Sequence, residues 1–367
     1  MNFERSSFAK SGMISIVQFR SKDADSFSYI SLQDAVSKGA IRIEEVDESG
    51  SVNNLKVSNS SDHYVFFSDG EILKGAKQDR VLNTSVLIEP GSVTVLPVSC
   101  IEAGRWRYQS RSFAASEFYE PSAMRMKKMV KVSASLRQGL KHRSDQSDVW
   151  RNVSEYESRK SFSSNTSNLS DVFESMSHSF AKNLNDIFPE VACNGMAIFI
   201  GKDIASIESF NSSAVYAEYF PKLLKAAYMD IDLYNTGEIS EEEAIKELSH
   251  AMKSVNDAKG EEHKAVAAGI EFRHHDDNMT LFRLNYGTTP IHLTALFRPG
   301  QTGGKVYWEN LDDLILNFGR YKGMKFKDLL RRDYESAMRL IASEDFNENE
   351  VEALLKELRK FRKANRK

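Results

Sequence analysis

Short runs in which apolar and polar residues alternate dominate the first hundred positions, and this pattern predicts β-strands. Three of these runs are rich in β-branched and aromatic residues, namely Met13–Phe19, Ile41–Val46 and Tyr64–Leu73. A further stretch, 85–101, predicts two strands joined as a hairpin through the turn at Glu89-Pro90-Gly91. The residues before Gly12 are polar, so we expect a frayed N-terminus followed by a β-rich core.

Apolar residues recur at helical spacing further along the chain, in the stretches 169–188, 216–224 and 241–255. The chain returns to strands between Ile270 and Phe297, with a break at Gly287. The order of these elements predicts an α+β fold, in which helices are added to a β-rich N-terminal core.

Two consecutive segments depart from this pattern of strands and helices. Residues 125–143 contain seven Lys or Arg and no acidic residue, and residues 144–179 are crowded with serine. The low hydrophobicity of the serine-rich segment predicts an exposed connection. If residues 305–367 do not account for binding to nucleic acid, the basic segment is the better candidate, because clustered cations attract phosphates.

Proline and glycine cluster from Arg298 to Gly304, which marks the best domain boundary in the chain. We expect one domain at 13–298, a linker at 299–304 and a small basic, mainly helical module at 305–367. This module carries fifteen Lys or Arg and twelve Asp or Glu, a net charge of 15 − 12 = +3. The whole chain of 367 residues has a net charge of −3, so positive charge is concentrated in the module.

The chain has two cysteines, Cys100 and Cys193, which is too few for a secreted disulfide scaffold. Its start lacks the apolar run of a signal peptide, and no stretch approaches the ~18 apolar residues of a membrane span. These features predict a cytoplasmic protein that does not enter the membrane. Glycine-rich dinucleotide loops, nucleoside-triphosphate loops, HExxH pairs and zinc-type cysteine spacings are also missing from the sequence, which excludes several common enzyme classes.

The richest polar stretch runs from Asp69 to Trp106, where two polar segments interrupt strand-like runs. If strands flank both segments, their polar residues lie at the same end of one sheet. The candidate catalytic residues are Glu71 and Glu102 as acid or base, Cys100 as nucleophile and Gln78 as a group that orients the reacting centre. The candidates for ligand binding are Lys77, Arg80, Arg105 and Trp106. The alternative is a structural ion-pair network in which Cys100 is a small buried hydrophobe.

The segments GEILKGAKQDRVLNTSVLIEPGS and LPVSCIEAGRW resemble the signature of the ARPP family, which is named for its association with ADP-ribosylglycohydrolase and rhodanese-phosphatase proteins. The resemblance covers about 13–298. It implies a role in the metabolism of ADP-ribose or NAD-derived nucleotides, and it leaves the reaction and the cofactor unknown. The positions that match the family pattern are Glu71, Gln78, Arg80, Cys100, Glu102, Arg105 and Trp106, with Gln146 and Trp150 behind them as ligand-binding candidates.

Two other polar segments look like metal sites and are better explained as turns. Residues 232–243 have the glycine and final Glu of a calcium loop, but Tyr234 stands where an oxygen ligand is needed. Ser240 is instead expected to cap the helix that follows. Adjacent residues in His274-His275-Asp276-Asp277 would point to opposite faces of a strand, so we expect a solvated turn and no metal site.

The C-terminal module interleaves cations and aromatics around two glycines and resembles the C-terminal module of exodeoxyribonuclease-X-like proteins over about 313–362. That resemblance implies an accessory contact with nucleic acid, because the acidic metal ligands of a nuclease are missing from the module. The candidate residues are Arg320, Tyr321, Lys322, Lys325, Lys327, Arg331 and Arg332. The alternative is a small hairpin whose aromatics fill a miniature core and whose cations are solvated.

Taken together, the residues and the resemblance predict a protein that binds or processes an ADP-ribose-like nucleotide, for example as a hydrolase of ADP-ribose-type linkages. In that reading Arg80 and Arg105 hold anionic groups, while Gln78 and Glu102 orient or activate the reacting centre. Glu102 is expected to be partly exposed and to contribute little to folding. The alternative is a non-enzymatic nucleic-acid- or protein-interaction protein of a defence or mobile-element system.

Overall fold

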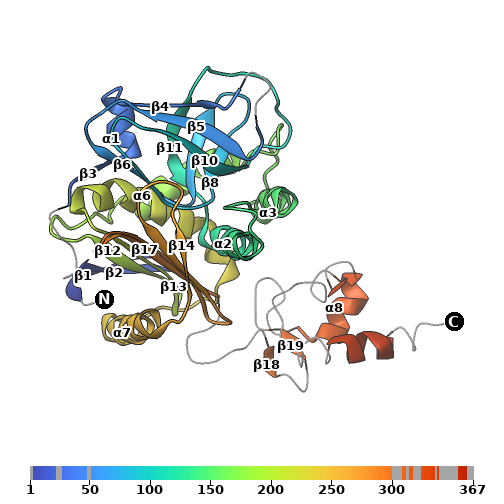
Figure 1. Ribbon diagram of the computed structural model, residues 1–367. Coiled ribbons are helices and arrows are strands. Elements are labelled where there is room, and N and C mark those ends of the chain that lie inside the picture. Colours follow the sequence, from blue (N-terminus) through green and yellow to red (C-terminus); the bar gives the residue numbers. More distant parts are fainter. Residues whose placement is uncertain are drawn as a thin grey trace. The chain divides into compact units, whose positions relative to one another are not determined.

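The computed structural model describes residues 3–21, 27–47, 51–299, 308–310, 314–316, 324–334, 337–338 and 354–361. The chain divides into two compact units. The first holds residues 1–231 and 236–298, and the second holds residues 232–235 and 299–367. The first unit is α+β, with β-sheets and added helices, and the described part of the second is a small group of short elements (Figure 1).

The largest sheet of the first unit joins strands from both ends of that unit. Its order is β1 (Phe3–Ser11), β2 (Ile14–Ser21), β12 (Gly195–Ile200), β13 (Asp203–Phe210), β17 (Thr289–Phe297), β16 (Met279–Tyr286), β15 (Ile270–His275) and β14 (Glu261–Lys264). All of its neighbouring strands are antiparallel. The prediction of a frayed N-terminus is therefore wrong, because β1 pairs with β2 from Phe3 to Ser11, with one irregularity between Arg5 and Ser7.

Two smaller sheets pack around a separate apolar core that includes helix α1 (Leu32–Ser37). One has the order β11 (Phe113–Tyr119), β7 (Glu71–Gly75), β8 (Arg80–Leu82), β10 (Val93–Cys100), β5 (Asn54–Asn59) and β4 (Ile41–Glu45). The other has the order β3 (Tyr29–Ser31), β6 (Tyr64–Phe67) and β9 (Val86–Ile88).

The stretch 85–101 forms the two predicted strands but not the predicted hairpin. Strand β9 pairs with β6, and β10 pairs with β5 and β8, so the turn at Glu89-Pro90-Gly91 carries the chain from one small sheet to the other. Gly91 has a φ of +61°, which agrees with the predicted turn. The residues of the turn were enough to predict where the chain reverses. They could not predict which strands pair with β9 and β10, because those strands are distant in sequence.

Helix α6 (Ser213–Met229) lies between the eight-stranded sheet and the smaller sheets, and α7 (Glu241–Asp257) covers the opposite face of the large sheet (Figure 1). The α7 helix begins with a capping box, in which Ser240 and Glu243 each bind the other's backbone N–H. This confirms the predicted cap. Asp276 accepts hydrogen bonds from the backbone N–H groups of Asn278 and Met279 and forms a turn, whereas His274 and His275, predicted to belong to the same turn, are the last residues of β15.

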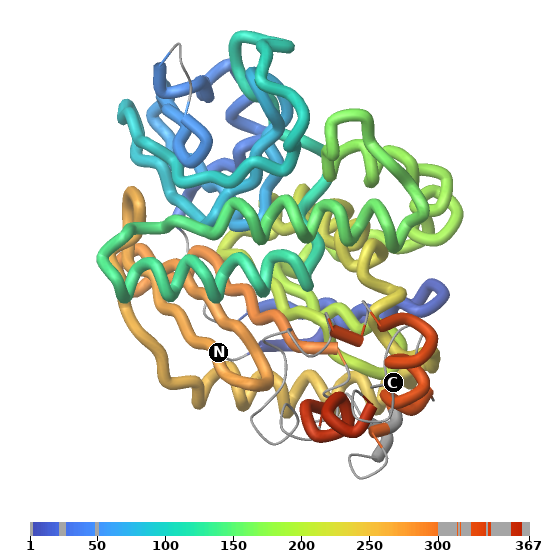
Figure 2. The backbone as a smooth tube through the Cα atoms, turned by 90° about the vertical axis from the view of Figure 1, so that its right-hand side faces the viewer, coloured from blue at the N-terminus to red at the C-terminus, as the bar shows by residue number. Residues whose placement is uncertain are grey.

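Helices α2 (Ser122–Arg137) and α3 (Gln146–Arg159) run side by side and antiparallel (Figure 2). Lys127 of α2 approaches Glu155 of α3 at 3.5 Å, and Lys131 approaches Asp148 at 3.4 Å. The serine-rich segment is therefore not an exposed connection. It continues into α4 (Leu169–Ser175) and α5 (Ser177–Leu184), and its apolar residues are buried at helical spacing.

In the second unit, strand β18 (Trp308–Asn310) pairs with β19 (Ile315–Leu316), and helix α8 (Phe326–Arg332) follows. A helical segment at 354–361 belongs to the same apolar core as α8. Among the described residues of the chain, no helix is both long enough and apolar enough to span a membrane.

Candidate functional site

The two polar segments of the sequence meet at one end of the six-stranded sheet. Strand β8 lies between β7 and β10, and Arg80 is directly opposite Cys100 in the ladder. The turn 76–79 and the loop 101–105 are therefore neighbours. The structure brings Gln78, Arg80, Glu102 and Arg105 to the same edge.

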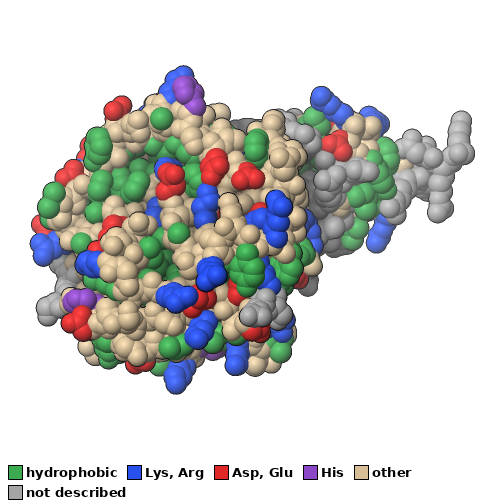
Figure 3. Space-filling model, turned by 90° about the horizontal axis from the view of Figure 1, so that it is seen from above, with side chains coloured by type: hydrophobic (Ala, Val, Ile, Leu, Met, Phe, Trp, Pro, Cys, Tyr) green, Lys and Arg blue, Asp and Glu red, His purple; other side chains and the backbone are tan. Residues whose placement is uncertain are grey.

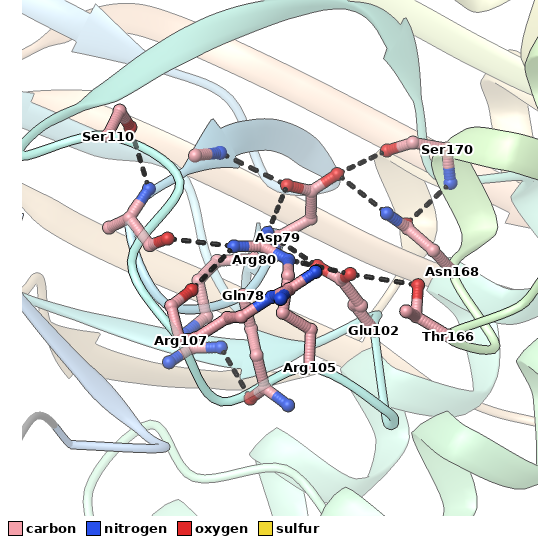
Figure 4. Close-up of polar contacts among 12 residues, drawn as sticks. Gln78, Asp79, Arg80, Glu102, Arg105, Arg107, Ser110, Thr166, Asn168 and Ser170 are labelled. Atoms are coloured by element: carbon pink, nitrogen blue, oxygen red, sulfur yellow. Dashed lines mark hydrogen bonds and ion pairs between the residues drawn. The ribbon is translucent and has the colours of Figure 1, made fainter.

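Glu102 and Arg105 form a closed group with Asp79, which we call the loop cluster. Arg105 donates to both carboxylate oxygens of Glu102, from Nε at 2.8 Å and from Nη2 at 2.6 Å (Figure 4). Glu102 also accepts hydrogen bonds from the backbone N–H of Asp79 and from the hydroxyl of Thr166. All four bonds involve a carboxylate that is almost completely buried.

Asp79 ties the same loops to a third segment of the chain. Its Oδ2 accepts hydrogen bonds from Asn168 at 3.1 Å and Ser170 at 2.8 Å, and its Oδ1 accepts one from the backbone N–H of Gly75 (Figure 4). Asn168 also caps helix α4. The loop cluster therefore joins the β7–β8 turn, the loop after β10 and the start of α4.

The hydrogen bonds of the loop cluster bear on two of the predicted site residues. Glu102 already accepts four hydrogen bonds, so its lone pairs are occupied by the fold and not by a substrate. The guanidinium of Arg105 is likewise engaged, because it also donates to the carbonyls of Ala76 and Arg107. These contacts are those expected of the structural ion-pair network that the sequence offered as the alternative.

Arg80 is in a different situation, although it lies next to the loop cluster. Its side chain is 0% exposed, and it donates from Nη1 to Oε1 of Gln78 at 3.0 Å. Its Nη2 lies 3.6 Å from Oε1 of Glu45, a residue of β4 that sequence reasoning missed. Among the described residues, Nε and Nη2 of Arg80 and both oxygens of Glu45 have no hydrogen-bond partner.

Unpaired polar atoms of this kind are expensive, because burying one without a partner costs about 1–3 kcal/mol and more for a charged group. We call Glu45, Gln78 and Arg80 the Arg80 cluster. Its unused donors and acceptors distinguish it from the loop cluster, although Asp69, Glu120 and Arg125 elsewhere in the domain also bury polar atoms without a hydrogen-bond partner in the described part of the chain.

Exposed aromatic rings lie beside the Arg80 cluster. The Trp106 and Tyr108 side chains are 47% and 52% exposed. The Lys77 amino group lies 5.3 Å from the Trp106 ring centre and 5.0 Å from that of Tyr108, and the Arg80 guanidinium carbon lies 5.7 Å from the Trp106 ring centre. Two cations and two accessible rings therefore adjoin each other.

Cys100 lies behind Arg80 and is not activated. Burial raises the pKa of the Cys100 thiol to about 11, although the nearby Arg80 charge lowers it. A neutral thiol is a poor nucleophile, so the predicted nucleophilic role is not supported. Gln146 binds the backbone N–H and C=O of Cys100 at 2.8 and 2.7 Å, which fixes helix α3 to β10, and Trp150 follows one turn later on α3.

Glu71 lies apart from these residues, at the opposite end of β7, which corrects its prediction as a member of the same group. It accepts a hydrogen bond from the Tyr219 hydroxyl at 2.5 Å, and its other oxygen lies 3.3 Å from the Lys222 amino group. Both partners belong to α6.

A second group of buried charges, the buried ionic network, joins the small sheets to the large one. Its members are Asp69, Glu120, Arg125, Lys128, Glu208 and His292. Arg125 donates to Glu208 of the large sheet at 2.7 Å, and its Nε lies 3.6 Å from Asp69 in the turn between β6 and β7. Lys128 reaches Glu120 at 2.5 Å and Asp69 at 3.1 Å.

The buried ionic network changes the interpretation of the basic segment 125–143. Arg125 and Lys128 lie three positions apart on the buried face of α2, so they point inward and not toward a nucleic acid. The sequence contains a signal for this burial. Arg125 and Lys128 recur at the helical spacing of Met124, Met129 and Val132, which are also buried in α2. Desolvation raises the pKa of Glu120 in this network to about 7, against the lowering effect of Lys128.

The charged residues on the accessible surface do not gather by sign on the face shown in Figure 3, which views the molecule from above. Lys and Arg side chains are interspersed there with Asp and Glu. Among the described residues, no group of three or more His, Cys, Asp or Glu is placed to hold a metal ion.

The predicted nucleic-acid residues divide into two sets. Arg320, Tyr321 and Lys322 lie outside the described residues. Lys327 lies in the first turn of α8 and Arg331 and Arg332 lie in its last turn, and all three are exposed; Lys325 precedes that helix. Arg331 lies 3.5 Å from Asp328, so part of its charge is balanced within the helix.

Residues 3–296 match the family model of the ARG and Rhodanese-Phosphatase-superfamily-associated Protein domain, ARPP-1. The chain belongs to the ARPP-1 family. The match spans the large sheet and both small sheets, so the loop cluster and the Arg80 cluster are both parts of an ARPP-1 domain. No curated protein and no solved structure matches the chain.

Proposed function

We propose that this ARPP-1 domain binds a nucleotide-like ligand of the ADP-ribose type. The ligand would contact the Arg80 cluster and the neighbouring rings of Trp106 and Tyr108, which we call the aromatic edge. The observation that carries the proposal is the fully buried Arg80 guanidinium, two of whose nitrogens have no hydrogen-bond partner in the described part of the chain. Guanidinium groups recognise phosphate oxygens through such paired donors.

The neighbouring side chains complement this role. Lys77 supplies a second cation, and the faces of Trp106 and Tyr108 suit a planar base, because stacking on aromatic rings is worth about 1–3 kcal/mol per base. Gln78 holds Arg80 in place through its amide oxygen. The ADP-ribosylglycohydrolase association behind the family resemblance supports a ligand of this class.

The proposal concerns binding in the first place. The carboxylate predicted as general base, Glu102, is occupied by four hydrogen bonds, and the Cys100 thiol is protonated at neutral pH. These two observations favour the second candidate function, a binding module without turnover, over a hydrolase of ADP-ribose-type linkages.

Isothermal titration calorimetry of the full chain with ADP-ribose, NAD, ADP and inorganic phosphate tests the proposal. We expect ADP-ribose or ADP to bind more tightly than phosphate alone, because only the nucleotides reach the aromatic edge. Chromatography of the same mixtures after incubation measures turnover. Absence of binding by all three nucleotides would overturn the proposal, and product formation would restore the hydrolase.

For the second unit, we propose a weak contact with nucleic acid, as an exodeoxyribonuclease-X-like module would make. The exposed cations of α8 and of the segment 354–361 support it. Binding of the full chain to a labelled single-stranded oligonucleotide is expected to weaken steeply with salt, with a log–log slope of about −0.7 per phosphate contacted. Affinity that does not change with salt would exclude this mode of contact.

A further inference from the structure

We propose that Glu45 is the group that recognises the sugar in this site, by accepting two hydrogen bonds from the vicinal hydroxyls of a ribose. This inference rests on the proposed nucleotide-binding function and deepens it. Sequence reasoning did not single out Glu45, because the run 41–46 has the pattern of an ordinary strand.

The position of Glu45 at the end of β4 separates it from its neighbour Glu44. Adjacent residues of a strand point to opposite faces. Glu44 is partly exposed and pairs with Arg42 at 2.8 Å, whereas the Glu45 side chain is 3% exposed and faces Arg80. Two chemically identical residues therefore occupy a surface position and an interior position on the same strand.

The contact between Glu45 and Arg80 differs from a completed ion pair in the same domain. Glu102 and Arg105 are joined at 2.6 and 2.8 Å, and further hydrogen bonds saturate the carboxylate. Glu45 and Arg80 approach only to 3.6 Å, beyond hydrogen-bond distance, and no described residue donates to Glu45. The pair is aligned but leaves its hydrogen-bonding capacity unused.

A nucleotide carries groups that are chemically complementary to both side chains. Its phosphate oxygens accept from the guanidinium, and its vicinal hydroxyls donate to the carboxylate. A carboxylate that binds ribose hydroxyls is a recurring solution in dinucleotide sites of other folds. A site built in this way discriminates against a sugar that lacks a hydroxyl, because the buried carboxylate is then left unpaired.

The test compares ADP with 2′-deoxy-ADP by calorimetry, using the full chain. The wild-type protein is expected to bind ADP at least tenfold more tightly. Glu45→Gln reduces the number of accepting oxygens and is expected to lower that ratio severalfold toward one. Glu44→Gln, the matched change on the surface of the same strand, leaves the ratio unchanged.

The outcomes separate this inference from the function on which it rests. Equal affinity of the wild-type protein for ADP and 2′-deoxy-ADP overturns the role of Glu45 and leaves nucleotide binding intact. Binding of neither nucleotide overturns both. If Glu45→Gln fails to fold, as judged by circular dichroism, the wild-type ratio still decides, because it requires no variant.

Discussion

Arg105 donates two parallel hydrogen bonds to Glu102, from Nε to Oε1 at 2.8 Å and from Nη2 to Oε2 at 2.6 Å. Such a bidentate pair is among the strongest polar contacts in proteins. Because the carboxylate also holds Asp79 and Thr166, the pair locks two loops beside the Arg80 cluster. Glu102 and Arg105 thus hold in place the loops that adjoin the Arg80 cluster.

Glu102→Gln is therefore expected to destabilise the protein. The change replaces an acceptor of the Arg105 fork with an amide nitrogen and leaves a buried guanidinium without its full counter-charge. We expect a loss of about 3 kcal/mol in the free energy of unfolding, measured by urea denaturation.

The matched control for this change is Glu174→Gln. Glu174 is more than half exposed and pairs with Lys74, so its replacement is expected to change stability by no more than about 1 kcal/mol. Glu102→Gln could instead be as stable as the wild type and lose most of an activity on a nucleotide. That result would contradict the structural role of Glu102 and support the catalytic one.

Arg125→Ala is expected to be more damaging, because Arg125 links Asp69, in the turn between β6 and β7, to Glu208 of the large sheet. Removing the cation leaves buried carboxylates uncompensated, at a cost of at least about 3 kcal/mol. Lys127→Ala, two positions along α2 on its exposed side, should change stability by less than about 1 kcal/mol. Similar thermal midpoints for the two variants would show that the buried ionic network does not join the sheets.

The difference between these two cations shows what the sequence alone does and does not determine. Charge alone made residues 125–143 a candidate for contact with nucleic acid. The burial of Arg125 and Lys128 within this segment depends on Asp69 and Glu208, which are distant in sequence and supply counter-charges. The composition of α2 shows that cations are present, but their partners are known only once the tertiary structure is known.

Local signals were more reliable than long-range ones for the same reason. The Ser240 cap and the turn at Asp276 depend on residues within three positions, and both were predicted. The partners of β9 and β10 lie elsewhere in the chain, and the predicted hairpin was wrong. For the site, the meeting of Arg80 with the loop after β10 followed from the strand pattern, whereas Glu45 had no local signal.

The buried Glu120 predicts a specific dependence of stability on pH. Burial raises its pKa in the folded protein to about 7, above the value of an unfolded Glu near 4.3. The native state therefore binds the proton more tightly between these pH values. The contribution of Glu120 to stability is fully present below about pH 4 and is lost as the pH rises to about 7.

Glu120→Gln removes this titration while keeping the shape of the side chain. We expect the stability of the variant relative to the wild type to increase between pH 5 and pH 8, as measured by urea denaturation at both values. A difference that is independent of pH, or one that decreases, would show that Glu120 is ionised throughout this range.

The binding of ADP-ribose to the Trp106→Ala variant tests the central claim most directly. Trp106 is exposed and forms the aromatic edge of the Arg80 cluster, so its removal should leave the fold intact and lose a stacking contact worth about 1–3 kcal/mol. Phe188, which is 70% exposed, gives the matched control Phe188→Ala. We predict by calorimetry that Trp106→Ala binds ADP-ribose about tenfold or more weakly than the wild type while Phe188→Ala binds equally well; equal affinities for all three proteins would contradict the account.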